Sequence, residues 1–107
     1  HPYLAACYSG LGRVYYSKKA YKAAMNHHLK SLDIRRKIHG VNHPDMAVCY
    51  NDMGDVYQGE GDNEKAKEHY LEALRFRKLA LGDDHPETIV VEKQVAKLKE
   101  DQKETGI

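Results

Sequence analysis

Seven histidines and two cysteines are the side chains of this 107-residue chain best suited to catalysis or metal binding. His27 and His28 are adjacent, His69 stands alone, and His39 lies four residues before His43. An imidazole can act as a general base or a metal ligand, but a zinc site needs three or four converging ligands. This spacing supplies no such set, and the sequence has neither a glycine-rich phosphate loop nor a nucleophile paired with a base. The sequence therefore predicts no enzyme, no metal site and no cofactor.

The positions of the histidines indicate a structural role. His-Pro pairs begin at His1, His43 and His85, each 42 residues after the one before, and His27 and His69 are separated by the same interval. A histidine that returns with a fixed period is expected to serve the repeated structure, because each copy then meets the same neighbours.

The two cysteines follow the same period. Cys7 and Cys49 are 42 residues apart, so they occupy one repeated position and are expected to lie roughly 10 Å apart, beyond the ~7 Å Cα separation that a disulfide tolerates. We expect both to be reduced, buried thiols, which favours a cytoplasmic chain.

Composition and charge narrow the classes of partner. The 17 basic and 16 acidic residues nearly cancel and are interspersed, so the basic patch of a nucleic-acid-binding protein is missing. No apolar run approaches the ~20 residues that a membrane-spanning helix needs. The chain has no initiator methionine and no signal-peptide pattern, so we expect it to be a fragment of a longer protein. The sequence predicts a protein partner, with no nucleic acid and no membrane.

The whole sequence is built on the 42-residue period. Residues 1–42 laid over 43–84 are identical at fourteen positions, and the third His-Pro pair opens a partial copy over 85–107. A period of 20 to 50 residues is typical of a solenoid, whose units bury their apolar faces by stacking on one another. We expect a single domain with two repeats, 1–42 and 43–84, followed by a capping helix and a frayed tail over 85–107.

Each repeat reads as a helix, a turn and a second helix. Apolar residues recur at three- and four-residue spacing within 1–16 and again within 21–40, with the corresponding pattern in the second copy. Asp62 is expected to cap the helix that follows it, and Gly40 and Gly82 to end helices in a left-handed conformation. With the capping helix the sequence predicts five helices.

A glycine recurs inside the first helix of each repeat, at Gly12 and Gly54. Glycine costs roughly 1 kcal/mol against alanine in a helix interior, so a repeated glycine indicates a repeated benefit. We expect it to allow close approach of the second helix, with Ala24 or Ala66 as the small residue opposite.

These patterns resemble the tetratricopeptide repeat in its 42-residue form, familiar from kinesin light chains. The matching stretches are HPDMAVCYNDMGDVY and NEKAKEHYLEALRFRKLALG, with HPYLAACYSGLGRVYY and YKAAMNHHLKSLDIRRKIHG before them. The resemblance covers residues 1 to about 98. It implies an all-α, right-handed solenoid of helical hairpins and a non-catalytic module for protein–protein interaction, of the adaptor or scaffold kind.

In this family the first helices of successive hairpins line a concave surface that binds an extended peptide. Asn51 matches the first Asn of the family's Tyr-Asn-Asn motif, and its amide can donate and accept hydrogen bonds at once. The same positions on the first helices and on the capping helix give the predicted peptide-binding residues: Ser9, Arg13, Tyr16, Asn51, Asp55, Gln58, Lys93 and Lys97.

Three of these residues form a row at the 42-residue spacing. Arg13, Asp55 and Lys97 are expected to lie side by side with alternating charge. We interpret the row either as a mildly positive groove that favours a peptide with one acidic residue, or as a solvated ladder of ion pairs without a role in recognition. A clamp for a C-terminal carboxylate is not favoured, because Asp55 stands among the basic residues and Gly10 replaces a polar side chain.

A different function stays open. An uncapped solenoid end exposes apolar side chains, here Tyr3, Cys7 and Val14, and exposed apolar patches drive association. The chain could therefore be a scaffold element that stacks on further repeats or on a second copy of itself.

Overall fold

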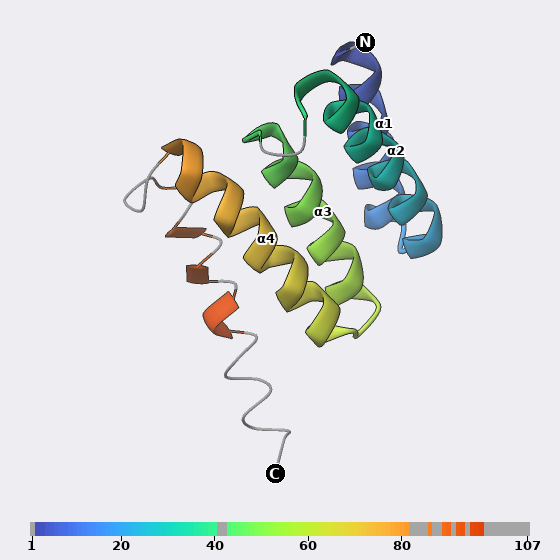
Figure 1. Ribbon diagram of the computed structural model, residues 1–107. Helices are drawn as coiled ribbons and strands as arrows, with labels where there is room; N and C mark the ends of the chain where they lie inside the picture. The colour runs from blue at the N-terminus through green and yellow to red at the C-terminus, as the bar shows by residue number, and fades with distance from the viewer. Residues whose placement is uncertain are drawn as a thin grey trace.

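The computed structural model describes residues 2–40, 43–81, 86, 89, 90, 92, 93 and 95–97. Its four helices are α1 (Pro2–Ser17), α2 (Tyr21–His39), α3 (Asp45–Gly59) and α4 (Asn63–Leu81). Each hairpin packs one helix against the next in the chain, and α3 also packs on α2, so the hairpins stack side by side (Figure 1). The described part of the chain contains no strand, which confirms the predicted all-α solenoid of helical hairpins.

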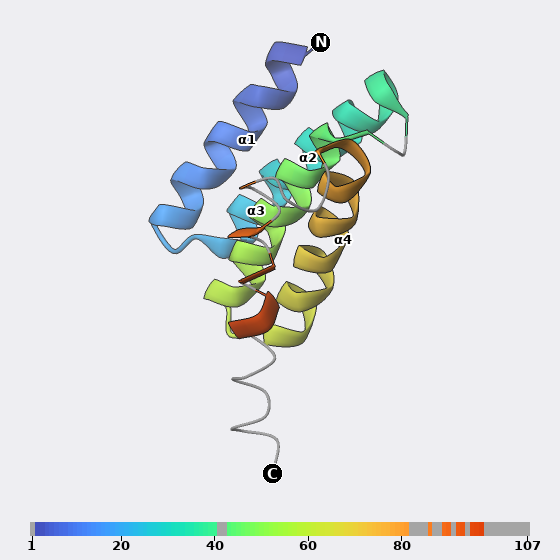
Figure 2. The same ribbon diagram turned by 90° about the vertical axis from the view of Figure 1, so that its left-hand side faces the viewer.

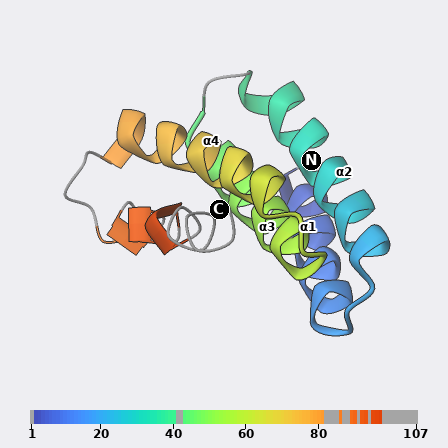
Figure 3. The same cartoon turned by 90° about the horizontal axis from the view of Figure 1, so that it is seen from below.

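The helix bounds follow the sequence period. Both ends of α4 lie 42 residues after the corresponding ends of α2, and α3 ends 42 residues after α1. The described residues between 86 and 97 are also helical and lie beside α4, on the side away from α1 and α2 (Figure 3). Gly82 and the end of the predicted capping helix lie outside the described residues.

The turns inside the two hairpins have a residue with positive φ at the same repeat position. Lys19 has φ 62° and its counterpart 42 residues later, Gly61, has φ 85°. After the second turn, the N–H of Lys65 donates to Asp62 Oδ1 at 3.1 Å, so Asp62 caps α4 as predicted. At the end of α2, Gly40 has φ 81° and donates its N–H to Arg36 O at 2.8 Å, which ends the helix.

Gly12 and Gly54 do mark close helix packing, but the predicted residue opposite is wrong. A Cβ at Gly54 would lie 2.6 Å from Tyr70 Cε1, and a Cβ at Gly12 would lie 2.5 Å from His28 Cε1. The rings of His28 and Tyr70, four residues beyond Ala24 and Ala66, therefore occupy the space that each glycine leaves. Both alanines are fully buried.

The main core lies between the two hairpins and inside the second one. It joins α2, α3 and α4 and includes one residue from the C-terminal segment, Val95, which is 5% exposed. The buried members of this core are Leu32, Met46, Ala47, Cys49, Met53, Ala66, Tyr70, Ala73, Phe76 and Val95. The C-terminal segment thus covers part of the second hairpin, as a capping element should.

The two cysteines differ in exposure. Cys49 is fully buried between the hairpins, and burial raises the pKa of its thiol. Cys7 is exposed, so the prediction that both thiols are buried is wrong for Cys7. The reason is position in the stack: α3 packs on α2, whereas in the described structure nothing packs on that side of α1, which forms one edge of the molecule (Figure 2).

Candidate functional site

Ser9 is not on the predicted binding face. It is 3% exposed and lies between α1 and α2, where its Oγ is 2.7 Å from Ser31 Oγ. Ser31 in turn donates to Ala5 O at 2.9 Å and lies 3.7 Å from Cys49 Sγ. A buried hydroxyl needs such partners, so Ser9 belongs to a polar contact that joins α1, α2 and α3, and the binding prediction for it is wrong.

Arg13 pairs with Asp52 and not with Asp55. Its Nη2 is 3.2 Å from Asp52 Oδ2, and Asp52 is 9% exposed. Arg13 and Asp55 form no ion pair, so this part of the predicted row is wrong. Asp52 lies one helical turn before Asp55 and is more deeply buried. An arginine interacts more strongly with a carboxylate that is partly removed from water.

Burial and positive charge act in opposite directions on Asp52. Burial raises the pKa of this carboxyl group, while the charges of Arg13, Arg35 and Arg77 lower it. The net direction is upward. His28 Nδ1 is 3.9 Å from Asp52 Oδ2, but burial lowers the pKa of His28 to about 4, so its ring is neutral at pH 7.

Asp55 is held by a tyrosine from the neighbouring helix. The Tyr70 hydroxyl donates to Asp55 Oδ1, and its oxygen is 3.0 Å from Gln58 Oε1. Burial raises the pKa of Asp55, whereas the Tyr70 hydrogen bond lowers it. The pKa of Tyr70 is raised by burial and by this bond. Tyr70 therefore stays protonated and fixes the position of Asp55 on α3, with Gln58 beside the same hydroxyl.

Tyr16 lies next to this group from the end of α1. It is 38% exposed, and its pKa is raised by burial and by the nearby charge of Asp55. Its ring also lies 6.0 Å from that of Tyr21, measured between centroids. The structure therefore brings together Arg13, Tyr16, Asp55 and Gln58 from two different helices.

Asn51 carries a buried amide oxygen, Oδ1, that accepts no hydrogen bond within the described part of the chain. The repeat explains this. In the first repeat the equivalent Ser9 bonds to Ser31, but in the second repeat Ser31 is replaced by Ala73, which is fully buried and has no polar side-chain group. The partner that the first repeat supplies internally is missing for Asn51.

Lys93 and Lys97 are exposed on the C-terminal segment. No ion pair joins Lys97 to Asp55 among the described residues, so the predicted row does not continue as a salt bridge. Among the described residues, an ion pair links this segment to α4, with Lys78 Nζ 3.6 Å from Glu92 Oε1. The candidate site therefore rests on α1 and α3.

Sequence reasoning missed Asp52 and Tyr70 as members of this site. Both differ from their counterparts 42 residues earlier, Gly10 and His28. The sequence did contain a signal for these two residues. At each of these positions the two repeats, which otherwise match, carry chemically different side chains.

The repeated histidines have structural surroundings. His27 Nδ1 is 2.8 Å from Ala23 O, and its ring stacks on Tyr15 with centroids 5.0 Å apart. In the second repeat, His69 Nδ1 is 2.8 Å from Lys65 O, and its ring lies 4.8 Å from that of Tyr57. Each ring thus packs between its own helix and the preceding one, as the repeat pattern predicts.

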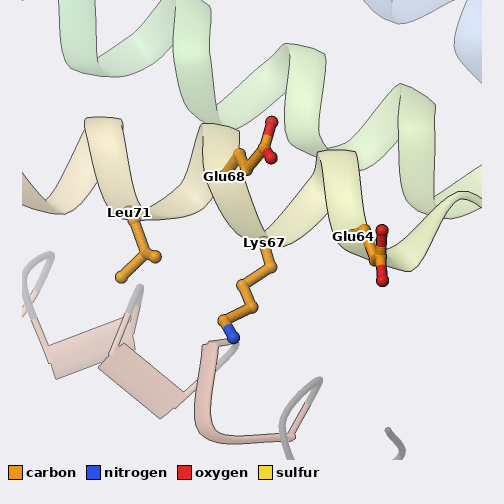
Figure 4. Close-up of a pocket in the computed structure, with 4 residues that line it drawn as sticks. All are labelled: Glu64, Lys67, Glu68 and Leu71. Carbon is orange, nitrogen blue, oxygen red and sulfur yellow. The ribbon is translucent and has the colours of Figure 1, made fainter.

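Two shallow pockets lie on α4, away from these residues. One of about 350 Å³ is lined by Glu64, Lys67, Glu68 and Leu71 on the surface of the helix (Figure 4). The second, of about 260 Å³, lies between α4 and the C-terminal segment and is lined by Leu71, Leu74, Lys78, Glu92, Val95 and Ala96. Among the described residues, the lining of these two pockets includes no base paired with a nucleophile.

Comparisons with known proteins identify the fold family. Among the described residues, no helix combines the length and apolar character needed to cross a bilayer. No curated protein matches the chain. The family model of the tetratricopeptide repeat matches residues 3–79. Such repeats are generally non-catalytic modules that bind other proteins. With two stacked hairpins in a 42-residue register and a match over most of its length, the chain belongs to the tetratricopeptide repeat family.

Proposed function

We propose that the surface formed by α1 and α3 binds an extended segment of a partner protein. We call this surface the α1–α3 face and define it by Arg13, Tyr16, Asn51, Asp55 and Gln58. The observation that carries the proposal is the amide of Asn51, whose buried oxygen has no partner in the described structure. A buried acceptor without a hydrogen bond costs roughly 1–3 kcal/mol, and a change in the side-chain torsions of Asn51 that exposes Oδ1 would let the backbone N–H of a bound peptide remove that cost.

The amide of Asn51 suits a peptide backbone. Rotation about its Cβ–Cγ bond exchanges Oδ1 and Nδ2, and the side chain as a whole is half-buried, so either atom can be turned toward a ligand. A peptide group offers one N–H and one C=O at fixed spacing, and a single amide can bond to both. Nearby, Asp55 is already fixed by Tyr70, with Gln58 beside the same hydroxyl, so little side-chain freedom is lost when a ligand binds.

The local charge favours a segment with an acidic residue. Three arginines, Arg13, Arg35 and Arg77, act on Asp52, and Asp55 adds a second negative charge near it. Arg13 is the exposed member, with 59% of its side chain accessible. Its guanidinium can contact a ligand carboxylate while it keeps one N–H on Asp52.

The test is a screen of a diverse peptide library against the chain and its Asn51→Ala variant. The matched control is Asn26→Ala, because Asn26 is exposed on α2. Peptides that bind the unchanged chain and Asn26→Ala, and lose at least tenfold in affinity for Asn51→Ala with unchanged helicity, support the proposal. Binders that do not distinguish the two variants contradict it.

A second function, association through the end of the stack, is favoured by the exposed side of α1. Leu4, Leu11 and Val14 are 47%, 45% and 49% exposed, and Cys7 is exposed beside them. Their counterparts on α3, Met46, Cys49, Met53 and Val56, are at most 2% exposed. On α3 this side is covered by another helical hairpin, so α1 presents a surface of the kind that a further repeat or a second copy would cover.

Light scattering over a range of concentrations tests this second function. Association predicts a mass that rises with concentration and returns to the monomer value in a Leu11→Glu, Val14→Glu variant. Leu29→Glu is the control, because Leu29 is 48% exposed on α2, away from this surface. A constant monomer mass at high concentration contradicts self-association through this surface.

A further inference from the structure

The turn between α2 and α3 brings together two imidazoles and a carboxylate. His39 Nε2 is 3.0 Å from Asp45 Oδ2, and His43 Nδ1 is 3.8 Å from Asp45 Oδ1. One ligand atom from each of His39, His43 and Asp45 lies within 4.8 Å of the other two. The spacing of His39 and His43 was noted from the sequence, but Asp45, which supplies the third ligand atom, was not included with them.

The ends of the two helices hold these side chains. His39 is the last residue of α2, and Asp45 is the first residue of α3. Gly40, with φ 81°, turns the chain between them. The His43 ring accepts the N–H of Asp45 at Nδ1, at 3.2 Å, and stacks on the His39 ring with centroids 3.9 Å apart and an angle of 11°. The positions of all three side chains therefore depend on how the end of α2 and the start of α3 are connected.

We propose that this turn binds a divalent transition-metal cation of the Zn²⁺ type through His39, His43 and Asp45. Neutral imidazole and carboxylate are ordinary Zn²⁺ ligands, at about 2.0–2.2 Å, so two ligand atoms of a tetrahedral site lie about 3.3 Å apart. The distances of 3.0 and 3.8 Å fall on either side of that value. Because an imidazole binds a metal in its ring plane and the two rings are stacked, metal binding requires the rings to turn out of the stack and His43 Nδ1 to release the Asp45 N–H.

Three protein ligands leave one tetrahedral position open. The three side chains are between 30% and 45% exposed, so a cation reaches them from solvent. Water fills the fourth position, or a side chain of a partner does. Imidazole ligands select against Mg²⁺ and Ca²⁺, which prefer oxygen ligands. The bound ion would link the end of α2 to the start of α3 and so fix the angle between the two hairpins.

A simpler use of these residues is a contact between His39 and Asp45 alone. The sequence of the next turn provides a comparison, because the positions 42 residues later hold Leu81, His85 and Glu87. His39→Leu therefore places at the first turn the residue that the chain itself uses at the second. The simple contact requires only His39 and Asp45, whereas metal binding requires His43 as well.

The test is calorimetric titration of the whole chain with Zn²⁺ alone. Variants His39→Leu, His43→Gln and Asp45→Asn remove one ligand each, and His69→Gln is the control because it removes a histidine outside the turn. The expected result is one saturable site per chain, weakened at least tenfold in each ligand variant and unchanged in the control. Zn²⁺ should also raise the unfolding temperature of the chain and of the control only.

Two outcomes would overturn the proposal. One is the absence of a saturable one-to-one site in the unchanged chain. The other is Zn²⁺ affinity in any of the three ligand variants equal to that of the chain, since the ion would then be held elsewhere. Circular dichroism checks that each variant keeps its helix content, and the ring-proton NMR signals of His39 and His43 should both shift on addition of Zn²⁺.

Discussion

His28 and Tyr70 occupy equivalent positions in the two repeats, but their rings have different consequences. Both fill the space left by a glycine on the preceding helix. Tyr70 carries a hydroxyl that reaches Asp55, whereas His28 brings a titratable ring that is 1% exposed. The first repeat therefore has a sensitivity to pH at this position that the second repeat lacks.

We predict that His28 makes the fold less stable in acid. Burial, with smaller effects of Arg13 and His27, lowers the pKa of His28 from 6.5 to about 4. Between these values the unfolded chain binds more protons than the folded one, so the contribution of this group is complete above pH 6.5 and is lost as pH falls toward 4. At 1.36 kcal/mol per pKa unit, the loss is at most about 3 kcal/mol.

The measurement is urea unfolding between pH 4 and 7 for the chain and for His28→Tyr, which introduces the residue of the second repeat. Asp52 and Asp55 titrate in both proteins, so the difference between the two profiles isolates His28. A smaller loss of stability in the variant is expected. Parallel profiles would show that His28 is not protonated more readily in the unfolded chain.

A second prediction at the scale of single residues concerns Gly54. A Cβ there would lie 2.6 Å from Tyr70 Cε1, so Gly54→Ala must displace the ring that holds Asp55. Overpacking of this kind costs roughly 1–3 kcal/mol. Gly10→Ala is the control, because a Cβ at Gly10 meets nothing within 4 Å and alanine gains about 1 kcal/mol in a helix. Chemical unfolding should show opposite signs, and two gains would contradict the packing described at Gly54.

At the scale of helices and turns, both hairpins need a residue with positive φ in the turn, and they use different residue types there. The turn between α1 and α2 places Lys19 at φ 62°, and the turn between α3 and α4 places Gly61 at φ 85°. A left-handed conformation costs a non-glycine residue roughly 1–2 kcal/mol. The first turn thus carries strain that the second does not.

We therefore predict that Lys19→Gly stabilises the chain and that Gly61→Ala destabilises it. Lys19→Gly removes the strain of the left-handed conformation, but glycine loses more backbone entropy on folding, so the net gain in stability should be about 0.5–1 kcal/mol. Gly61→Ala introduces that strain and should lower stability by about 1 kcal/mol. A Cβ at Gly61 meets nothing within 4 Å, so the cost there is conformational only. Thermal unfolding of both variants checks the signs. A loss of stability in Lys19→Gly would mean that the Lys19 side chain contributes more than its strain costs.

The helices could be predicted well from the sequence because the same pattern of residues occurs in both repeats. The 42-residue period located both hairpins and the packing role of Gly12 and Gly54, and the cap at Asp62 was predicted from its place after a glycine-containing turn. It failed where the repeats differ or where a residue lies at the end of the stack. Ser9 was assigned to the binding face by analogy with Asn51, but its hydroxyl is short enough to be buried against Ser31. Nothing in a linear pattern distinguishes these two outcomes.

The ion pairs of the site could also not be predicted from the sequence. Arg13 and Asp55 share a repeat position, and that alone suggested the row. Which carboxylate Arg13 contacts depends on the depth of Asp52 and on the tyrosine that holds Asp55. Both are consequences of packing between helices. Equal spacing along the chain therefore predicted that Arg13 and Asp55 pair with each other, whereas each has a different partner.

At the scale of the whole molecule, the stack is covered differently at its two ends. The C-terminal segment lies beside α4 (Figure 1). It contributes Val95 to the core, whereas Leu4, Leu11 and Val14 on the outer side of α1 are exposed. Units of a solenoid depend on their neighbours for stability. The second hairpin, which has a neighbour on both sides, should therefore be the more stable of the two.

We predict that Val95 links the C-terminal segment to this stability. Val95→Ala should lower the free energy of unfolding by about 1–2 kcal/mol, because it removes buried methyl groups from the core. Val90→Ala is the matched control on the same segment, since Val90 is 57% exposed and surface changes stay within about 0.5 kcal/mol. The measurement is urea unfolding followed by circular dichroism. Equal effects of the two variants would mean that the segment adds nothing to the core.

Because the two cysteines differ in exposure, their rates of chemical labelling can report how often the two hairpins separate. A thiol-specific reagent should modify Cys7 at once, whereas Cys49 can react only when α2 and α3 separate, since it is fully buried between the hairpins. When opening is rapid relative to labelling, the ratio of the two rates measures the free energy of that separation. No probe has to be introduced, and a ligand or cation that holds the hairpins together would slow the labelling of Cys49 and leave that of Cys7 unchanged.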